Sequence, residues 1–485
     1  MAKNTAVIDI GSNSVRMVIF QKSSRFAFHI VHEAKCQARI SESMYKNYSY
    51  LQQEPMRRAS AAIGDFLDIA KNYSVRKILC VGTSALRDAK NAHEFIKEIK
   101  NSYKLDIKVI DGTKEAYYCG IACANLLPSI DSAITVDIGG GSCEISLLNN
   151  GKIISNHSLD IGTVRIKELY LDRGDIDGAI SYIDSQIASL NLSTTTIIGV
   201  GGSFRNIAKS IMKTDEYPLK KLHGYRFSAK KLLQVTKDIY SGDDKKLKKL
   251  HIKSERADTI GSGALILERI ALHQQCKDII SSGVGVREGL YLSDLLRNNR
   301  GYFPSNYNPS VRSIIDRFSK NSQISINNTN LTKQIFTLTH KHLNIDIRYK
   351  GILSIASKLM DIGSEINIYS GDSHSSYIAI NALNYALEHS DIALISHLLL
   401  FKKETKSSDI KTDLAELLPS KSVLNSLHFI LWLSHTINKN QNIKTKPQLS
   451  FENSKLSISG INSHLLQQEI KNLVIPKEIT IKLED

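Results

Sequence analysis

Two segments of the chain repeat one pattern, in which an apolar run ends in Asp-Ile-Gly and is followed by small polar residues and a second apolar run. The first segment reads TAVIDIGSNSVRMVIF from residue 5, and the second reads AITVDIGGGSCEISLL from residue 133. Each predicts a strand, a tight turn and a second strand. Asp137 follows Asp9 by 128 residues (137 − 9), a spacing that indicates a duplicated domain and not a solenoid repeat.

The residues of both loops suit the binding of an anion such as phosphate. A phosphate loop needs backbone N–H groups that point inward and no Cβ where an oxygen comes close, and glycine provides both. A third Gly-rich segment opens a predicted helix, whose N-terminus also favours an anion. One such loop alone fits an ordinary tight turn equally well, so the repeat is the stronger signal. The predicted phosphate-binding residues are Gly11, Ser12, Asn13, Ser14, Ser84, Gly139, Gly140, Gly141, Ser142, Gly201, Gly202 and Ser203.

Acidic residues stand beside the two repeated loops. Asp9 and Asp137 each end a predicted strand. A carboxylate there can hold Mg²⁺ together with phosphate oxygens, or it can cap its own turn. Glu144 follows the second loop, and strand alternation puts it on the same face as Ser146 and opposite Ile145. We predict Asp9, Asp137 and Glu144 as metal ligands.

Glu115 and Arg87 are two further charged residues near these segments. Glu115 opens the helix predicted at 114–127, where the helix dipole alone favours an acidic residue. Arg87 follows the pair Thr83-Ser84 and carries a guanidinium that can clamp a phosphoryl oxygen bidentately. A single Arg is more often a surface residue, so neither side chain is assigned a catalytic role on its own.

The order of strands and helices predicts an α/β architecture over the first 300 residues. Strands are predicted at 5–10, 15–20, 77–82, 107–112, 133–138 and 143–148, with a strand running into a Gly-rich turn at 194–203 and helices at 56–73, at 114–127 and after 203. The segment RNNRGYFPSNYNPS then predicts a domain boundary. Helices are predicted beyond it at 311–320, 330–343, 351–362, 375–388, 391–402 and 422–437, with short strands and turns from 446.

Composition limits the classes of partner and compartment. The net charge of +15 favours polyanionic partners, a class that includes nucleic acid, anionic membranes and polyphosphate. The run KKLKKL at 245–250 is either a solvated helix face or an anion-binding rim. Six scattered cysteines without a Cys-x-x-Cys pair predict reduced thiols in a cytoplasmic protein. We find no signal peptide, and no apolar run reaches the roughly 20 residues that span a bilayer.

Over about residues 1–300 the chain resembles the exopolyphosphatase/guanosine pentaphosphatase (Ppx/GppA) family, a branch of the actin-like, ribonuclease H-like ATPase fold. The resemblance is carried, in order, by VIDIGSNSVRMVIF, GTSALRDAKN, IDGTKEAYYCGI, ITVDIGGGSCEISLL, LDIGTVRIKELY, IIGVGGSFRNIAK, HGYRFS and GVGVREGLY. It implies that Glu115 is the catalytic base and that Arg87, Asp137 and Glu144 match the family's loop Arg and second-loop acids. The chain departs from the family at Lys114, where the family has a second acid.

The resemblance also implies the domain organisation, with actin-like domains at 1–128 and 129–300 and a mostly helical HD-like domain at 305–485. The segment LMDIGSEINIYSGDSHSSY resembles the core of that last domain. An HD phosphohydrolase needs a His-Asp pair and further His ligands, but the pair here is Met360-Asp361, and His374 and His397 do not complete a set. We therefore predict a structural domain with a degenerate metal motif, which widens a basic channel or forms a dimer contact.

The activity that the resemblance implies is Mg²⁺-assisted release of orthophosphate from the ends of inorganic polyphosphate by a homodimer. Hydrolysis of guanosine pentaphosphate by the same residues is the first alternative. A non-catalytic sensor of polyphosphate or of an alarmone belongs to a different class, and a sugar kinase of the same fold ranks below both. Neither nucleic acid nor a membrane is an expected partner.

Overall fold

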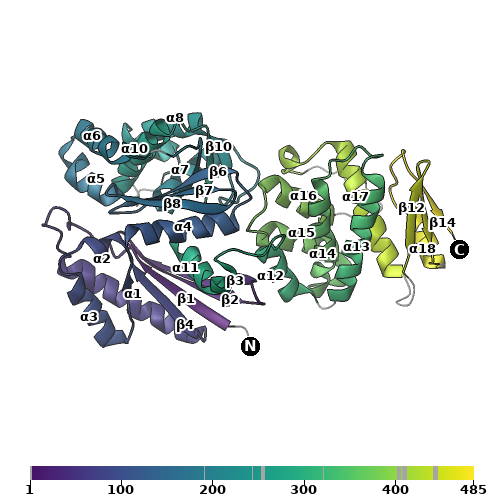
Figure 1. The fold of residues 1–485 in the computed structure, drawn as a ribbon, viewed down its shortest axis with the longest axis horizontal. Helices are drawn as coiled ribbons and strands as arrows, with labels where there is room; N and C mark the ends of the chain where they lie inside the picture. The colour runs from purple at the N-terminus through teal and green to yellow at the C-terminus, as the bar shows by residue number, and fades with distance from the viewer. Residues whose placement is uncertain are drawn as a thin grey trace. The chain divides into compact units, whose positions relative to one another are not determined.

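The computed structural model describes residues 3–190, 192–242, 244–252, 257–319, 322–400, 406, 412–440, 446–461 and 463–484. The chain divides into two compact units, Met1–Tyr307 and Asn308–Asp485 (Figure 1). Within the described ranges, no helix combines the length and the apolar character that crossing a membrane requires.

The first unit contains two sheets whose strands follow the same order. In each, a central strand forms an antiparallel hairpin with the next strand, which pairs antiparallel with a third, and parallel strands lie on the other side. The first sheet runs β3 (Phe28–Cys36), β2 (Val15–Lys22), β1 (Lys3–Ile10), β4 (Lys77–Gly82) and β5 (Lys108–Val109). The second runs β8 (Lys152–Leu159), β7 (Cys143–Asn149), β6 (Ser132–Ile138), β9 (Thr196–Val200), β11 (Asp278–Ser281) and an antiparallel edge strand, β10 (Arg226–Ser228). The α/β prediction is confirmed, and the shared order is what a duplication produces.

One face of each sheet is covered by helices. Each sheet and the helices that cover it form one half of the unit, the first half around the first sheet and the second half around the second. Apolar side chains of the first sheet pack against α1 (Gln53–Asn72) and α3 (Ala92–Tyr103), with the short α2 (Ser84–Asp88) following β4. The second sheet is covered by a larger group of helices, and these are α5 (Thr163–Leu169), α6 (Ile176–Ile187), α7 (Gly201–Thr214), α8 (Ala229–Tyr240) and α10 (Ala257–His273). The basic run at 245–250 is helical as far as Lys249, in α9 (Asp244–Lys249), which agrees with the reading as a helix face and does not test an anion-binding role.

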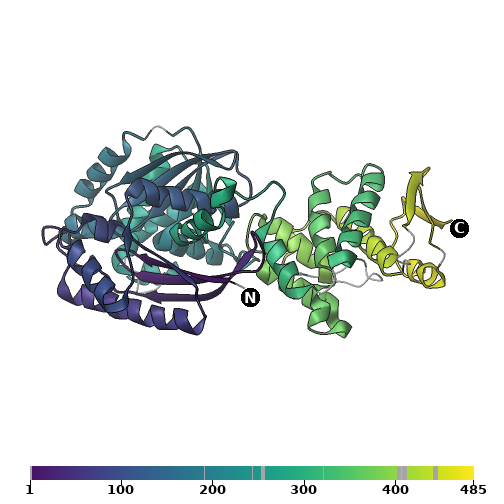
Figure 2. The same cartoon turned by 60° about the horizontal axis from the view of Figure 1, so that its bottom comes forward.

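Two helices, α4 (Gly112–Leu126) and α11 (Val286–Leu295), lie between the sheets (Figures 1 and 2). α4 packs on β7 and β8, and α11 packs on α4 and on β1. The two helices approach so closely that a Cβ built at Gly289 would lie 1.7 Å from the carbonyl oxygen of Tyr118. Tyr291 of α11 also stacks on Phe20 of β2, with ring centroids 4.2 Å apart. The last helix of the second half therefore joins the core of the first half.

Three predicted elements of the first unit end or begin elsewhere. The strand predicted at 107–112 is only two residues long, because Asp111 caps α4: its carboxylate accepts the backbone N–H of Lys114 at 2.7 Å, and the helix begins at Gly112. The segment after β4, where no helix was predicted, is helical from Ser84. The Gly-rich turn predicted up to residue 203 is absent, since α7 begins at Gly201 directly after β9.

The second unit is a helical bundle followed by a small sheet. Its core is formed by Leu, Ile and Phe side chains of six helices, which are α12 (Pro309–Phe318), α13 (Ser322–Thr339), α14 (Tyr349–Leu359), α15 (Gly371–Ala382), α16 (His389–Leu400) and α17 (Lys421–Asn440). The predicted strands of the tail are β12 (Gln448–Glu452), β13 (Lys455–Ser459) and β14 (Thr480–Leu483). The helix α18 (His464–Lys471), which Ser463 caps by accepting the N–H of Leu466, was not predicted.

Candidate active site

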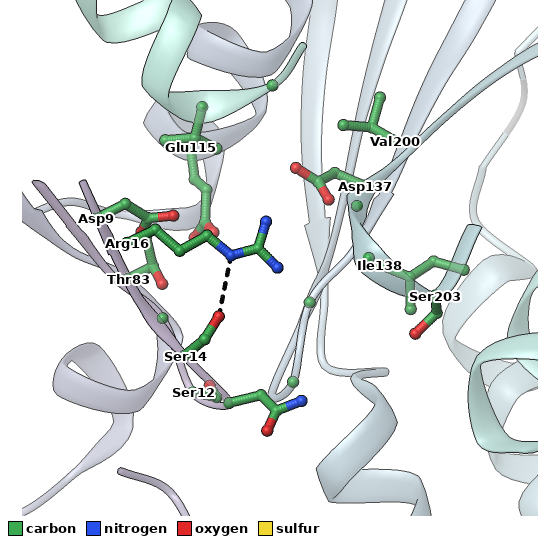
Figure 3. Close-up of a pocket in the computed structure, with 18 of the residues that line it drawn as sticks. Asp9, Ser12, Ser14, Arg16, Thr83, Glu115, Asp137, Ile138, Val200 and Ser203 are labelled. Atoms are coloured by element: carbon green, nitrogen blue, oxygen red, sulfur yellow. Dashed lines mark hydrogen bonds between the residues drawn. The ribbon is translucent and has the colours of Figure 1, made fainter. Parts of the chain in front are cut away.

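A cavity of about 130 Å³ lies in the first unit where the three Gly-rich segments converge (Figure 3). It has four carboxylates, three arginines and several hydroxyls in its wall. The lining residues are Asp9, Gly11, Ser12, Asn13, Ser14, Arg16, Thr83, Ser84, Glu115, Asp137, Ile138, Gly139, Gly140, Thr163, Val200, Gly201, Gly202, Ser203, Arg205, Gly285, Val286, Arg287 and Glu288. Of the predicted phosphate-binding residues, only Gly141 and Ser142 are not part of this wall.

The two repeated loops have the same turn and touch each other. The N–H of Gly11 donates to the carbonyl of Ser14 at 3.2 Å, and the N–H of Gly139 donates to the carbonyl of Ser142 at 3.0 Å. A Cβ at Gly140 would lie 2.5 Å from the Cβ of Ser12. Glycine at this position is what allows the second loop to pack against the first.

Gly201, at the start of α7, needs to be glycine for two reasons. Its φ is +83°, a backbone conformation that L side chains rarely adopt. A Cβ there would also lie 2.6 Å from Oδ1 of Asp137. The N-terminus of α7 can therefore approach the Asp137 carboxylate closely, and it faces the cavity.

Asp9 and Asp137 lie on opposite sides of the cavity, at the ends of β1 and β6 (Figure 3). Burial raises the pKa of Asp9 to about 6, against the opposing effect of the Arg287 and Arg16 guanidinium groups. Burial likewise raises the pKa of Asp137, which Arg205 and Arg16 oppose. The cavity therefore contains acidic groups that are costly to ionise until positive charge arrives.

Glu115 lies in the first turn of α4, and its side chain reaches the same side of the cavity as Asp9 (Figure 3). The residue is 8% exposed, and Nη1 of Arg87 donates to its Oε2 at 3.0 Å. Burial and the nearby Glu144 carboxylate raise the pKa of Glu115 well above its usual range, whereas Arg87 lowers it. A carboxylate with a raised pKa is a stronger proton acceptor, which suits a general base.

Glu144 and Arg87 form a layer behind this wall. Glu144 is 1% exposed and accepts a hydrogen bond from Ser158 Oγ at 3.1 Å, and burial raises its pKa to about 8. Nη2 of Arg87 donates to Ser142 Oγ at 3.1 Å and lies 3.9 Å from Oε1 of Glu144. The predicted phosphate clamp thus connects Glu115 to the second loop, and it is not part of the cavity wall.

Two smaller predictions concern residues next to these. Ser146 is on the Glu144 face of β7 as predicted, because its Oγ donates to the carbonyl of Ala116 in α4 at 2.7 Å while Ile145 packs in the core of the second half. Lys114, at the position where the resemblance expects a second acid, places its Nζ 4.4 Å from the ring centroid of Tyr117. Lys114 does not line the cavity.

Three arginines in the wall were not predicted as site residues. Arg16 lies opposite Asp9 in the register of β1 and β2, and its Nε donates to Ser14 Oγ at 3.1 Å (Figure 3). Arg205 donates to the carbonyls of Ser282 and Val284 at 2.8 and 3.1 Å, which fixes its orientation, and Arg287 comes from α11. Arg16 had a readable signal, since it is the only charged residue in the apolar run VRMVIF.

The donor set of the cavity fits Mg²⁺ only in combination with phosphate. No three His, Cys, Asp or Glu side chains of the described ranges converge as a metal cage. Mg²⁺ is commonly held by one or two carboxylates, with substrate phosphates and water completing its six ligands. Asp9 and Asp137, facing one cavity lined by phosphate-type loops, meet this requirement, whereas Glu144 lies behind the wall.

The raised pKa of Asp9 predicts a pH-dependent gain of stability in Asp9→Asn. Between the usual pKa near 4 and the folded value of about 6, the folded state holds more protons than the unfolded state, so unfolding free energy falls as pH rises. In Asp9→Asn the side chain cannot ionise, so this fall of the unfolding free energy with pH does not occur. With EDTA present, we expect the variant to match the parent near pH 4 and to exceed it by roughly 2 kcal/mol above pH 6. Calorimetric unfolding from pH 4 to 8 tests this, with the exposed Asp68→Asn as control, and a difference that does not change with pH contradicts it.

Comparison with known proteins places this chain in a family. The Ppx/GppA phosphatase family matches residues 18–298. A bifunctional 3-dehydroquinate synthase/phosphatase of Fusobacterium nucleatum is 29% identical over 288 residues, which is 55% of this chain and 42% of that protein. A guanosine-5'-triphosphate,3'-diphosphate pyrophosphatase of Photobacterium profundum is 22% identical over 489 residues, covering 98% of this chain and 95% of that protein. Exopolyphosphatase 2 of Mycobacterium tuberculosis is 25% identical over 292 residues, covering 55% and 89%.

The solved structures agree on the fold of the first unit. The crystal structure of the Ppx/GppA family member of Aquifex aeolicus superposes with a TM-score of 0.52 at 24% identity, over 62% of this chain and 99% of that one. The family match begins within β2 and extends past the end of α11, so it includes most of both sheets and 17 of the 23 residues of the cavity wall. The first loop and Asp9 precede it. The predicted actin-like α/β fold is confirmed for this part, and the chain belongs to the Ppx/GppA phosphatase family.

Proposed function

We propose that the chain hydrolyses terminal phosphoanhydride bonds and releases orthophosphate from the ends of inorganic polyphosphate. The observation that carries this proposal is the Glu115 carboxylate in the wall of a small cavity that also contains Gly-rich loops, two aspartates, Glu288 and three arginines. The volume of about 130 Å³ suits one phosphoryl group better than a nucleoside. The net charge of +15 further favours a long polyanion as substrate.

In the proposed reaction, the loops and arginines hold the terminal phosphoryl group, and Glu115 handles the proton. Backbone N–H groups and Arg16, Arg205 and Arg287 compensate its negative charge. Glu115 accepts a proton from a water molecule as the water oxygen forms a bond to the terminal phosphorus. The bond from this phosphorus to the bridging oxygen breaks, and the shortened chain leaves with that oxygen.

Asp9 and Asp137 are the residues that we propose to hold Mg²⁺, with Glu144 supporting the site from behind. The ion would supply neutralisation of the charge on the transferred group and its leaving oxygen. Arg87 keeps Glu115 oriented through its hydrogen bond at 3.0 Å and connects it to the second loop through Ser142.

Guanosine pentaphosphate is the second candidate substrate, and one observation favours it. The Photobacterium profundum relative, whose name specifies guanosine-5'-triphosphate,3'-diphosphate, matches 98% of this chain, whereas the Mycobacterium tuberculosis exopolyphosphatase matches 55%. The cavity accommodates the terminal phosphate of either molecule. A binding-only sensor has less support, because sensing does not require a buried carboxylate at the position of Glu115.

The second unit is the helical bundle that begins at Asn308 and ends in a small sheet. We propose that it is HD-like with a degenerate metal motif, on the resemblance of the segment that contains Met360 and Asp361. His374, on α15, and His397, on α16, belong to no group of metal-binding side chains in the described ranges. Homodimer formation, alarmone binding and a cytoplasmic location also stay predictions.

The proposal predicts metal-dependent phosphate release. Long-chain polyphosphate with Mg²⁺ should yield orthophosphate at a steady rate, EDTA should abolish the release, and excess Mg²⁺ should restore it. A coupled phosphate assay on polyphosphate and on guanosine pentaphosphate, at matched concentrations of terminal phosphate, decides between the substrates. Release that continues in EDTA contradicts the metal site, and no release from either molecule contradicts the hydrolase proposal.

A further inference from the structure

The backbone carbonyls of the second Gly-rich loop are hydrogen-bonded to the first residues of α5. The N–H of Thr163 donates to the carbonyl of Gly139 at 2.9 Å, and the N–H groups of Val164 and Arg165 donate to the carbonyl of Gly140 at 2.8 and 3.2 Å. A peptide unit is planar and trans, so an anchored carbonyl also fixes the direction of the N–H on the same unit. The start of α5 therefore sets the shape of this loop.

This close packing leaves N–H groups of the loop unused. A Cβ at Gly162, the residue before α5, would lie 2.3 Å from the carbonyl oxygen of Gly140, so glycine is what permits the approach. Among the described residues, no group accepts a hydrogen bond from the N–H of Gly140 or Gly141. Gly140 also lines the cavity. The anchored loop therefore keeps backbone donors available for an anion.

The carbonyl of Gly141 differs from the other two, because a side chain holds it. Nε of Arg165 donates to this oxygen at 2.8 Å. In the first loop, the matching carbonyl is that of Asn13, which accepts the backbone N–H of Arg39 at 3.1 Å. The first half thus anchors this carbonyl with a backbone group, whereas the second half uses a side chain. A substitution at Arg165 releases the carbonyl without changing the loop or the cavity wall.

The same guanidinium also contacts the first half of the unit. Nη2 of Arg165 donates to Oδ2 of Asp88, in α2, at 2.7 Å and to Oδ1 of the exposed Asp160 at 3.3 Å. The guanidinium carbon lies 4.5 Å from the ring centroid of Tyr45, whose hydroxyl donates to Asp88 at 3.5 Å. The Arg165 and Asp88 side chains are 16% and 21% exposed, so water screens this ion pair less than a surface pair. α2 and α5 belong to different halves (Figure 1), and Arg165 joins them beside the second loop.

The two ends of this link lie next to a contact on which the proposed reaction depends. Nη2 of Arg87 donates to Oγ of Ser142 at 3.1 Å, and Nη1 of Arg87 donates to Oε2 of Glu115 at 3.0 Å. Arg165 binds the residue before Ser142 and the residue after Arg87. Loss of its guanidinium therefore frees both partners of the contact that orients Glu115.

We propose that Arg165 is a positioning residue for phosphate release, which acts through the second loop and Arg87 on Glu115. Its bond to the Gly141 carbonyl keeps the loop in the shape that meets Arg87, and its bond to Asp88 keeps Arg87 against the loop. Arg165 itself does not line the cavity. The kinetic part of this inference rests on the proposed function, because it requires Glu115 to be the base.

Removal of the guanidinium should affect kcat more than KM. In Arg165→Ala we expect kcat for phosphate release to fall by about 10–100-fold and KM to stay within about threefold, because the loops and arginines of the cavity wall remain. Arg165→Lys should recover part of the loss, since one ammonium can bind the Gly141 carbonyl or Asp88 but lacks the fork that binds both. Millimolar guanidinium ion should partly restore kcat of Arg165→Ala in a saturable manner.

Arg173→Ala is the matched control. Arg173 is an exposed arginine in the short helical turn Leu171–Arg173 that follows α5, so this variant should match the parent and should not respond to guanidinium. A normal kcat in Arg165→Ala, a loss confined to KM, or a loss that neither lysine nor guanidinium reduces would overturn the proposal. If Arg165→Ala fails to fold, as judged by circular dichroism, Arg165→Lys alone decides, and a kcat equal to that of the parent rejects the assignment.

Hydrogen exchange provides a readout that does not depend on turnover. The amides of Gly139, Thr163 and Val164 donate within the second loop or to it, and in Arg165→Ala they should exchange roughly tenfold faster than in the parent, with the first loop unchanged. Mass spectrometry of the full chain measures this. Unchanged exchange overturns the positioning role whether or not the chain hydrolyses polyphosphate. Faster exchange in a chain whose parent form releases no phosphate supports the role in shaping the loop and rejects only the proposed function.

Discussion

Glu115→Gln is expected to lower kcat for phosphate release by about 10²–10⁴-fold, the contribution of a positioned general base. The amide keeps the size and shape of the side chain and can still accept a hydrogen bond from Arg87, but it cannot take the proton of the attacking water. Binding should change little, because the loops and arginines that surround the phosphate are untouched. The measurement is kcat and KM in a coupled phosphate assay, together with polyphosphate affinity by calorimetry.

Glu94→Gln provides the matched control for this substitution. Glu94 is also an acidic residue in the first turn of a helix, α3, but it is exposed and does not line the cavity. Loss of helix-dipole stabilisation is therefore similar in both variants, and only Glu115→Gln removes a base. Substantial turnover in Glu115→Gln would reject the assignment, and equal losses in both variants would point to helix stability as the cause.

Gly289→Ala is expected to destabilise the first unit by about 3 kcal/mol or more, at the upper end of typical overpacking costs. The added methyl would lie 1.7 Å from the carbonyl oxygen of Tyr118, and this neighbour is backbone that cannot rotate away. α4 and α11 would have to move apart, and α4 carries Glu115. We therefore expect reduced activity together with a lower unfolding midpoint in urea.

The same substitution at Gly261 separates steric conflict from the general effect of replacing glycine. Gly261 lies inside α10, and a Cβ there would meet only the Cα of Tyr240 at 4.0 Å. Alanine should stabilise that helix by up to about 1 kcal/mol. A loss at Gly261 as large as the loss at Gly289 would show that close helix packing is not the reason.

The loops of the candidate site could be predicted because their information is local. Backbone turns that bind anions depend on glycine and short polar residues that follow one another in the chain. Asp9 and Asp137 could be predicted because each ends a predicted strand. Whether the loops meet depends on the packing of distant segments, as Gly140 against Ser12 illustrates. Arg287 could not be predicted for the same reason, because α11 returns to β1 only in the folded chain. Arg205, on α7, is oriented by the carbonyls of Ser282 and Val284, which are also distant in sequence.

The errors in the second unit have a different origin. The helix α13 was predicted to start at 330 but begins at Ser322, since the segment SQISINNTN has too many polar residues to show an apolar stripe. Periodicity detects a helix by its apolar face, and here part of the inward face is polar, with Asn328, Thr329 and Thr332 buried. The short α18 was assigned to strands and turns although Ser463 provides a helix N-cap, because eight residues give too short a window to show a helical period.

The buried carboxylates of the first unit make some substitutions energetically favourable and their reversal unfavourable. Asp9, Glu115 and Glu144 all have raised pKa values because they lie in a poorly solvated region, so replacing any one by its amide relieves an energetic cost near neutral pH. Loss of hydrolysis is then accompanied by a gain in stability, and no compensating substitution is required. A protein that no longer needs turnover can therefore lose these carboxylates, keep the phosphate loops and become a receptor. The reverse change, from receptor to hydrolase, has to introduce buried carboxylates that lower folding stability.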